Sequence, residues 1–227
     1  MLTILYFKLT FHFHNRILIP YYCKILLEKY FATQEGDSNM SEEITNGGSA
    51  SYNRTRNLTL IGLMTAVLCI LGPFSIPIPV SPVPLSLTNF AVYITVYTLG
   101  MKSGTLSVLV YLCLGTAGLP VFSGFSGGLG KLAGPTGGYL IGFLFLALIQ
   151  GFFMEHIPGQ RLSSILGMII GLAVCYTFGT VWLAGQMSLS FSAALSAGVI
   201  PYLPGDILKI IAAAIIGPKL LTTVKKI

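Results

Sequence analysis

The sequence predicts an all-α, polytopic membrane protein with six transmembrane helices and both termini on the cytoplasmic side. Of its 227 residues, 54% are hydrophobic and only 9% are charged, whereas soluble domains carry about 25% charged residues. Its 26 glycines and 12 prolines divide the apolar part into segments of helical length. The formal charge of +6 does not indicate a nucleic-acid-binding protein, because the basic residues are scattered singly and form no patch or stripe.

The charged residues divide the chain near residue 56, since residues 1–56 hold five of the seven acidic side chains. We interpret residues 1–39 as a translated upstream leader outside the fold, with Met40 as the natural start. No apolar run there reaches the roughly 18 residues of a spanning helix, and no signal-peptide order is present. An amphipathic surface helix is the alternative. Residues 40–56 are then a polar cytoplasmic tail, and residues 57–227 form a six-helix membrane domain.

Within this domain, glycine and proline separate apolar spans that suit a bilayer core needing about 20 residues per helix. The first span ends before Pro73, the second lies between Pro84 and Gly100, and the third ends at Gly118. The last span begins at Pro204. The six expected helices cover residues 57–72, 85–100, 104–118, 136–154, 162–185 and 204–221.

The positive-inside rule orients these helices. With the amino terminus inside, the outer loops hold a single basic residue, Lys131. The inner side holds seven: Arg54, Arg56, Lys102, Arg161, Lys219, Lys225 and Lys226. The outer segments 74–89, 118–138 and 187–204 are rich in chain-breaking residues. Such backbone is tolerated at membrane depth only where it is buried in protein or lines a cavity.

Asp206 and Lys209 are the only ionisable pair that we place within a span. They lie three residues apart on one helical face, and Asp206 falls in the first turn, where the helix dipole favours a carboxylate. Mutual neutralisation, with Asp206 as a helix cap, is the alternative. Because a charge at depth in lipid costs about 2.5–3.5 kcal/mol, we predict that this pair binds substrate.

A glycine-rich loop follows Pro120, with seven glycines in the fifteen positions from Gly124 to Gly138. It is not a phosphate-binding Walker A loop, because Phe125 and Leu132 occupy positions that need Gly and Ser or Thr. We expect a tight outer cap over a ligand, and an ordinary re-entrant turn is the alternative. The cap would carry Phe122, Ser123, Phe125 and Ser126.

Two further pairs are candidates for binding roles. Thr88 and Asn89 stand at the mouth of the second expected helix, where backbone capping is an equal alternative. Gly62 and Ala66 form a small-xxx-small pair that lets membrane helices approach closely, and internal packing is the alternative. The sequence has no HExxH motif, no Ser/His/Asp order, no metal-ligand spacing and no intramembrane carboxylate pair. We therefore expect neither an enzyme nor a metal site.

Three stretches together resemble the BioY family, the biotin-binding S components of energy-coupling-factor (ECF) type ABC transporters. They are VPLSLTNFAVY (83–93), GLPVFSGFSGGLGKLAGPTGGYLIGF (118–143) and PYLPGDILK (201–209). The resemblance covers residues 57–227 in order and spacing. It implies a six-helix subunit of the bacterial cell membrane, surrounded by lipid, that binds biotin near the outer face and needs no cofactor. Its partners would be a transmembrane coupling (T) subunit and two ATPase (A) subunits.

The resemblance also implies residue roles. Asp206 and Lys209 match the family's Gly-Asp-x-x-Lys pair, which is implicated in holding the ureido ring. The covering aromatic residues would be Phe122, Phe125 and Tyr139. Thr88 or Asn89 would replace a glutamine of many members, Gly124 replaces a polar residue of some relatives, and Gly62 with Ala66 would dock the coupling subunit. Lys131 is a candidate for the biotin carboxylate. A stand-alone biotin facilitator and an S component for another vitamin are the alternatives.

Overall fold

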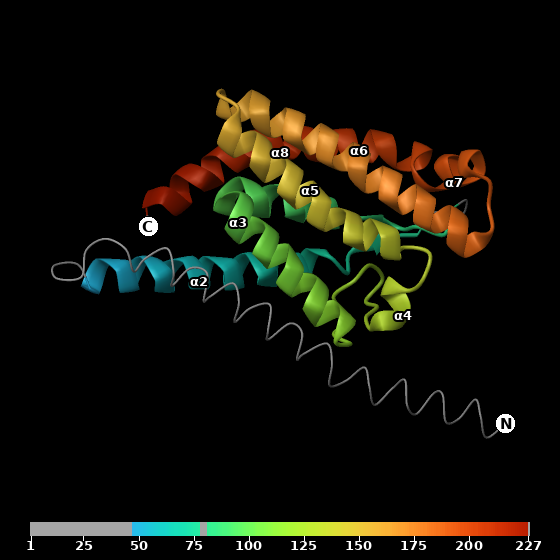
Figure 1. Cartoon of the computed structure of the whole chain (residues 1–227), viewed down its shortest axis with the longest axis horizontal. Helices are drawn as coiled ribbons and strands as arrows, with labels where there is room; N and C mark the ends of the chain where they lie inside the picture. Colours follow the sequence, from blue (N-terminus) through green and yellow to red (C-terminus); the bar gives the residue numbers. More distant parts are fainter. Residues whose placement is uncertain (1–46, 78–80, 227) are drawn as a thin grey trace, which may run out of the picture. The chain divides into compact units, whose positions relative to one another are not determined.

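The computed structural model describes residues 47–77 and 81–226, which are mainly helical (Figure 1). The chain comprises two compact units, residues 1–58 and 59–227, and their boundary falls within helix α2 (Gly47–Leu71). The leader, residues 1–39, and both chain ends lie outside the described residues. The expectations for the leader, the start at Met40 and the cytoplasmic termini therefore stay predictions.

The six predicted helices are present, but several ends differ. Helix α2 begins at Gly47, ten residues before the expected start, so residues 47–56 of the expected polar tail are helical. No proline interrupts this stretch, and its polar residues are compatible with a helix. Helices α5 (Gly137–His156) and α6 (Gln160–Met187) agree with the prediction to within a few residues. Helix α8 (Leu203–Lys226) runs past the expected end at residue 221.

Helix α3 (Thr88–Thr116) contains two of the predicted helices, divided at Gly100. Gly100 has φ 78° and ψ −172°, a backbone conformation that glycine adopts readily and other residues rarely do. Glu155 at the end of α5 receives the freed N–H of Met101 on its Oε1 atom at 2.9 Å. The glycine therefore breaks the helix where the sequence predicts a break, and a carboxylate caps the second half.

The expected start of the second helix at residue 85 is wrong. Leu85 and Ser86 form strand β2, which pairs antiparallel with strand β1 (Ser75–Ile76) in the proline-rich segment. Helix α3 then begins at Thr88. The pairing orders the segment that leads into α3 and leaves the carbonyl groups of β2 next to α8, where Ser86 is used by the site described below.

The core of the second unit lies among α3, α5, α6 and α8. Valine, leucine and tyrosine side chains of α3 pack against α5, and the Gln150 side-chain amide donates to the Tyr93 carbonyl oxygen at 3.0 Å. Short helices α4 (Leu129–Leu132), α7 (Phe191–Gly198) and η1 (Ile200–Tyr202) fill two of the connections predicted to face outward. The turn-rich segments are thus partly helical and close one end of this core.

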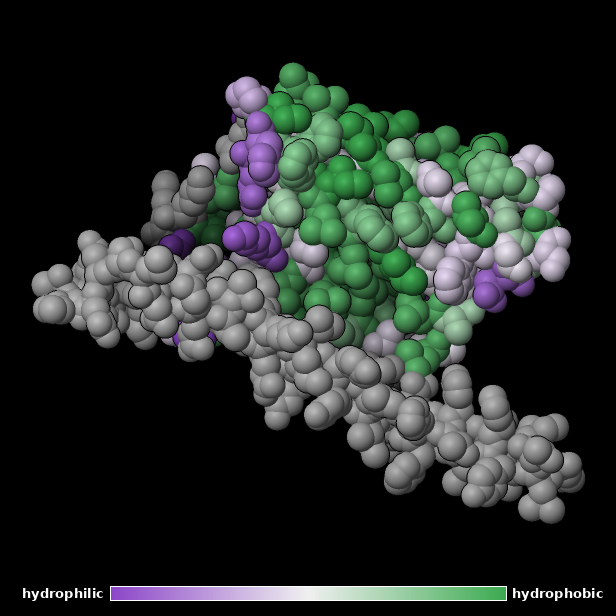
Figure 2. Space-filling view, in the orientation of Figure 1, coloured by the Kyte–Doolittle hydropathy of each residue, from purple (hydrophilic) through white to green (hydrophobic). Residues whose placement is uncertain are grey.

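The described residues contain five stretches long and apolar enough to cross a membrane. Two of the predicted helices are joined in α3, so five stretches are consistent with the six expected helices. Figure 2 shows a broad apolar face over α5 and α6, with hydrophilic residues gathered near the helix ends. Large apolar side chains such as Ile170, Leu208 and Ile215 are at least 40% exposed. Soluble proteins rarely expose so extensive an apolar surface, so this apolar surface of the helices faces lipid.

Candidate ligand-binding site

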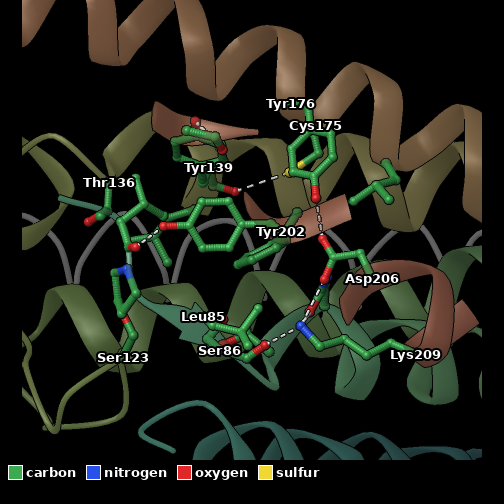
Figure 3. A pocket seen from close by; sticks show the side chains of 18 residues that line it. Leu85, Ser86, Ser123, Thr136, Tyr139, Cys175, Tyr176, Tyr202, Asp206 and Lys209 are labelled. Atoms are coloured by element: carbon green, nitrogen blue, oxygen red, sulfur yellow. Dashed lines mark hydrogen bonds and ion pairs between the residues drawn. The ribbon is translucent and has the colours of Figure 1, made fainter. Parts of the chain in front are cut away.

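A cavity lies between the first turns of α5 and α8, the middle of α6 and the segment that leads into α3 (Figure 3). It holds about 610 Å³ of empty space, part of it open to solvent. Of the side chains predicted to bind substrate, five line this cavity: Thr88, Asn89, Tyr139, Asp206 and Lys209.

Asp206 and Lys209 form an ion pair at one end of the cavity. The distance from Lys209 Nζ to Asp206 Oδ1 is 2.8 Å, and Asp206 is only 3% exposed. The Tyr176 hydroxyl of α6 donates a short hydrogen bond to Asp206 Oδ2. Both carboxylate oxygens therefore have a fixed partner, which orients the carboxylate and stabilises its negative charge away from bulk water.

Lys209 is fully engaged by the protein. Besides Asp206, its ammonium donates to the Ser86 carbonyl oxygen at 2.6 Å and to Asn89 Oδ1 at 3.1 Å. An ammonium has three donors, and all three are used here. Lys209 therefore holds α8, β2 and the start of α3 together, and it sets the orientation of the Asn89 amide.

Asn89 and Asp206 keep free hydrogen-bonding capacity toward the cavity. Asn89 Oδ1 accepts from Lys209 and from the Phe90 N–H at 3.2 Å. Among the described residues, no acceptor contacts the Asn89 Nδ2 group. A carboxylate has about four lone-pair sites, and the hydrogen bonds to Asp206 use two of them. The cavity wall thus offers one amide donor beside an oriented carboxylate acceptor.

Aromatic and aliphatic side chains form the rest of the wall. Tyr202 of η1 donates a short hydrogen bond to the Val83 carbonyl oxygen, and Tyr139 of α5 donates to the Gly198 carbonyl oxygen at 3.1 Å. Both hydroxyls are tied to backbone, so the rings present apolar faces to the cavity. Leu140, Phe143 and Leu172 line it as well. Thr88 is 2% exposed, with its hydroxyl 3.5 Å from the Gly72 carbonyl oxygen.

The glycine-rich loop does not bring all of its predicted residues to the cavity. Phe122 is fully buried and packs edge-on against Tyr111, with ring centroids 5.5 Å apart. Phe125 is 65% exposed and packs against Phe74, with φ 53° in the left-handed region. The Ser126 hydroxyl donates to the Ser123 carbonyl oxygen at 2.8 Å. Ser123 is the one residue of this predicted set that lines the cavity.

Three other predicted residues lie away from the cavity wall. Gly62 and Ala66 are exposed on α2, and the space beside Gly62 is open to 4 Å from an added Cβ atom. Lys131 in α4 is half-buried, and burial lowers the pKa of its ammonium. It does not line the cavity. Gly62 and Ala66 are thus accessible on α2, Lys131 lies outside the cavity wall, and the roles expected for all three stay predictions.

The sequence analysis missed Tyr176, Tyr202 and Thr136. Tyr202 stands in the PYLPGD stretch that carries Asp206, so its motif was a usable signal. Tyr176 lies in an apolar helix and gains its role only because α6 packs against α8. Within the described residues, no group of three His, Cys, Asp or Glu side chains could hold a metal ion.

Comparison with known proteins gives one consistent result. The model of the BioY family matches residues 40–226. The chain is 38% identical to the biotin transporter BioY of Thermotoga maritima over 165 residues, 73% of this chain and 95% of that protein. It is 35% identical to the Rhizobium etli biotin transporter BioY over 172 residues, which are 72% of this chain and 91% of that protein. A solved structure, the S component for biotin from an ECF-type ABC transporter, superposes with a TM-score of 0.70 at 31% identity, covering 78% and 94%.

Proposed function

Since this chain belongs to the BioY family, we propose that it is the biotin-binding S subunit of an ECF-type ABC transporter and captures biotin at the outer face of the cell membrane. The observation that carries the proposal is the Asp206–Lys209 pair, held by Asn89 and Tyr176 in the wall of the cavity. The relatives named above are transporters, and the chain belongs with them rather than with enzymes.

Biotin suits this wall. Its ureido ring carries two N–H donors and a carbonyl acceptor. The free lone pairs of Asp206 would accept the N–H groups, and the Asn89 Nδ2 group would donate to the carbonyl oxygen. Lys209 would act mainly by holding these two side chains, because its three donors are already used. The apolar sulfur-containing ring that is fused to the ureido ring would contact Tyr139, Phe143 and Tyr202.

A competition panel tests the choice of ligand. The purified full chain in detergent is titrated with labelled biotin, and then challenged with unlabelled biotin and with other water-soluble vitamins. We expect unlabelled biotin to displace the label at a concentration at least a hundredfold lower than any other vitamin in the panel requires. If another vitamin displaced the label at a lower concentration than biotin, the proposed ligand would be wrong. The chain would then be an S component with a different specificity.

The partners are a coupling subunit and two ATPase subunits, and we propose that Gly62 and Ala66 dock the coupling subunit. Both are exposed on α2, and the small side chains permit close helix approach. Gly62→Leu should leave biotin binding unchanged and reduce biotin uptake at least tenfold in vesicles containing all subunits. Gly185→Leu is the matched control, because Gly185 is also exposed on a helix with open space beside it. Equal uptake by both variants would exclude Gly62 from docking.

A further inference from the structure

Helices α3 and α8 pack against each other and run in the same direction beneath the cavity. Two contacts set their register. Next to the cavity, Lys209 Nζ donates to Asn89 Oδ1 at 3.1 Å. About two turns further along both helices, a Cβ atom added to Gly217 would lie 2.6 Å from the ring of Tyr97. Both contacts join residues 120 positions apart, so Tyr93 lies between them, on the face of α3 that packs against α8.

Tyr93 carries a hydroxyl at the centre of this interface. It lies one turn further into α3 than Asn89, and the side chains of a helix lean toward its amino terminus, so the Tyr93 ring points back toward Asn89. Tyr93 is fully buried and does not line the cavity itself. Among the described residues, no group forms a hydrogen bond with its hydroxyl. An unpaired hydroxyl is costly inside a membrane protein, so this one needs a partner.

The polar groups close to this hydroxyl belong to the Asp206 network. Asp206, Cys175 and Tyr176 all lie near enough to interact with Tyr93 electrostatically. The Tyr176 hydroxyl donates to Asp206 Oδ2 (Figure 3), and within the described part of the chain no donor reaches its oxygen, which keeps its capacity to accept. A water molecule between two such groups satisfies both, since a buried water needs about two to four polar partners.

We infer that one bound water molecule links the Tyr93 hydroxyl to the Tyr176 hydroxyl, and that Tyr93 is a positioning residue for the Asp206 carboxylate. The water accepts a hydrogen bond from Tyr93 and donates one to the Tyr176 oxygen, and Tyr176 donates to Asp206. Each member of such a chain polarises the next, which strengthens the bond to the carboxylate. The inference rests on the proposed function, because it assigns a further residue to the end of the cavity that would bind the ureido ring.

A double-mutant cycle tests whether Tyr93 acts through Tyr176. Biotin affinity is measured by calorimetry for the full chain, for Tyr93→Phe, for Tyr176→Phe and for the double variant. We expect Tyr93→Phe alone to weaken biotin about fourfold, because its effect reaches the carboxylate through two further hydrogen bonds. In the Tyr176→Phe background, the same replacement should change affinity less than about 1.5-fold. An unchanged affinity of Tyr93→Phe, or an equal loss in both backgrounds, would overturn the inference.

Tyr97→Phe is the matched control, because it removes the same atom one turn further along the same face of α3. Tyr97 is 1% exposed and lies outside the cavity wall. The control should leave biotin affinity unchanged. Equal losses in Tyr93→Phe and Tyr97→Phe would show an effect of packing alone and would also overturn the inference. A wild type that binds no biotin would instead contradict the proposed function.

Thermal unfolding of the ligand-free protein tests the water site without biotin. Removing an unpaired buried hydroxyl would raise the unfolding midpoint, whereas removing one that is hydrogen-bonded to a bound water should lower it. We expect Tyr93→Phe to unfold at a lower temperature than the wild type in one fixed detergent, and the Tyr176→Phe background to reduce this difference. A midpoint at or above the wild-type value would overturn the water site, whatever ligand the chain binds.

Discussion

The two ends of the cavity use polar groups in opposite ways. At one end, Asp206, Lys209, Asn89 and Tyr176 are joined by hydrogen bonds and an ion pair before any ligand arrives. At the other end, Ser123 and Thr136 present hydroxyls without described partners. A network already paired is rigid and selects a ligand by shape and by the few positions left open, whereas unpaired donors gain more from each new hydrogen bond. The difference predicts distinct mutational effects.

The largest effect on binding is expected from Asp206→Asn. The replacement keeps the shape of the side chain but removes its charge and turns one oxygen into a donor that opposes the ureido N–H groups. Two hydrogen bonds to a charged group are worth about 3 kcal/mol or more together, so biotin affinity should fall at least a hundredfold. Calorimetric titration measures it. Affinity within fivefold of the wild type would place the ureido ring elsewhere.

Lys209→Met should act on stability as strongly as on binding. Removing the ammonium leaves the 3% exposed Asp206 carboxylate without its cation, and breaking a buried pair in this way costs about 3–5 kcal/mol. The thermal unfolding midpoint in one fixed detergent should drop, and the double variant Asp206→Asn with Lys209→Met should recover part of the loss. A double variant less stable than both single variants would show that the pair is not coupled.

Tyr176→Phe should have an intermediate effect. It removes the hydroxyl that orients Asp206 Oδ2 and leaves the ring in place. Biotin affinity should fall about tenfold, close to the worth of one charge-assisted hydrogen bond. Tyr97→Phe removes the same atom from a buried tyrosine outside the cavity and should change affinity less than twofold. Equal losses in the two variants would mean that Tyr176 supports only the fold.

Phe125→Ala should have the smallest effect on affinity, less than about twofold, because the ring is 65% exposed and packs against Phe74 outside the cavity. The family resemblance instead implies that Phe125 covers the ligand, which requires the loop to rearrange on binding. Stopped-flow dissociation of labelled biotin separates these cases. If biotin dissociated from the Phe125→Ala variant at least tenfold faster than from the wild type, the result would support a loop that rearranges and covers the bound ligand.

The sequence predicted the helices well because glycine and proline act locally. Gly100 divides α3 where the two spans were separated, since its φ of 78° interrupts the helix whatever surrounds it. The start of the second helix was misplaced because β1 and β2 pair across the proline-rich segment, and no local pattern indicates that pairing. Local signals thus define most breaks, while contacts between segments decide where Leu85 and Ser86 belong.

The candidate site was only partly predictable for the same reason. Asp206 and Lys209 were conspicuous because charge is rare in an apolar span, and they lie on one helical turn. Phe122 was expected at the ligand, but Gly115 leaves a space that its ring fills, so it joins the core. Tyr176 and Thr136 carry no local signal. Their roles follow from the packing of α6 on α8 and from the point at which α5 begins.

The most direct test of the account is a structure of the full chain with biotin bound. We predict that the ureido N–H groups lie within hydrogen-bonding distance of the Asp206 carboxylate. The ureido oxygen should face the Asn89 amide. Biotin bound in the reverse orientation, with its carboxylate at Lys209, or bound outside this cavity, would contradict the account.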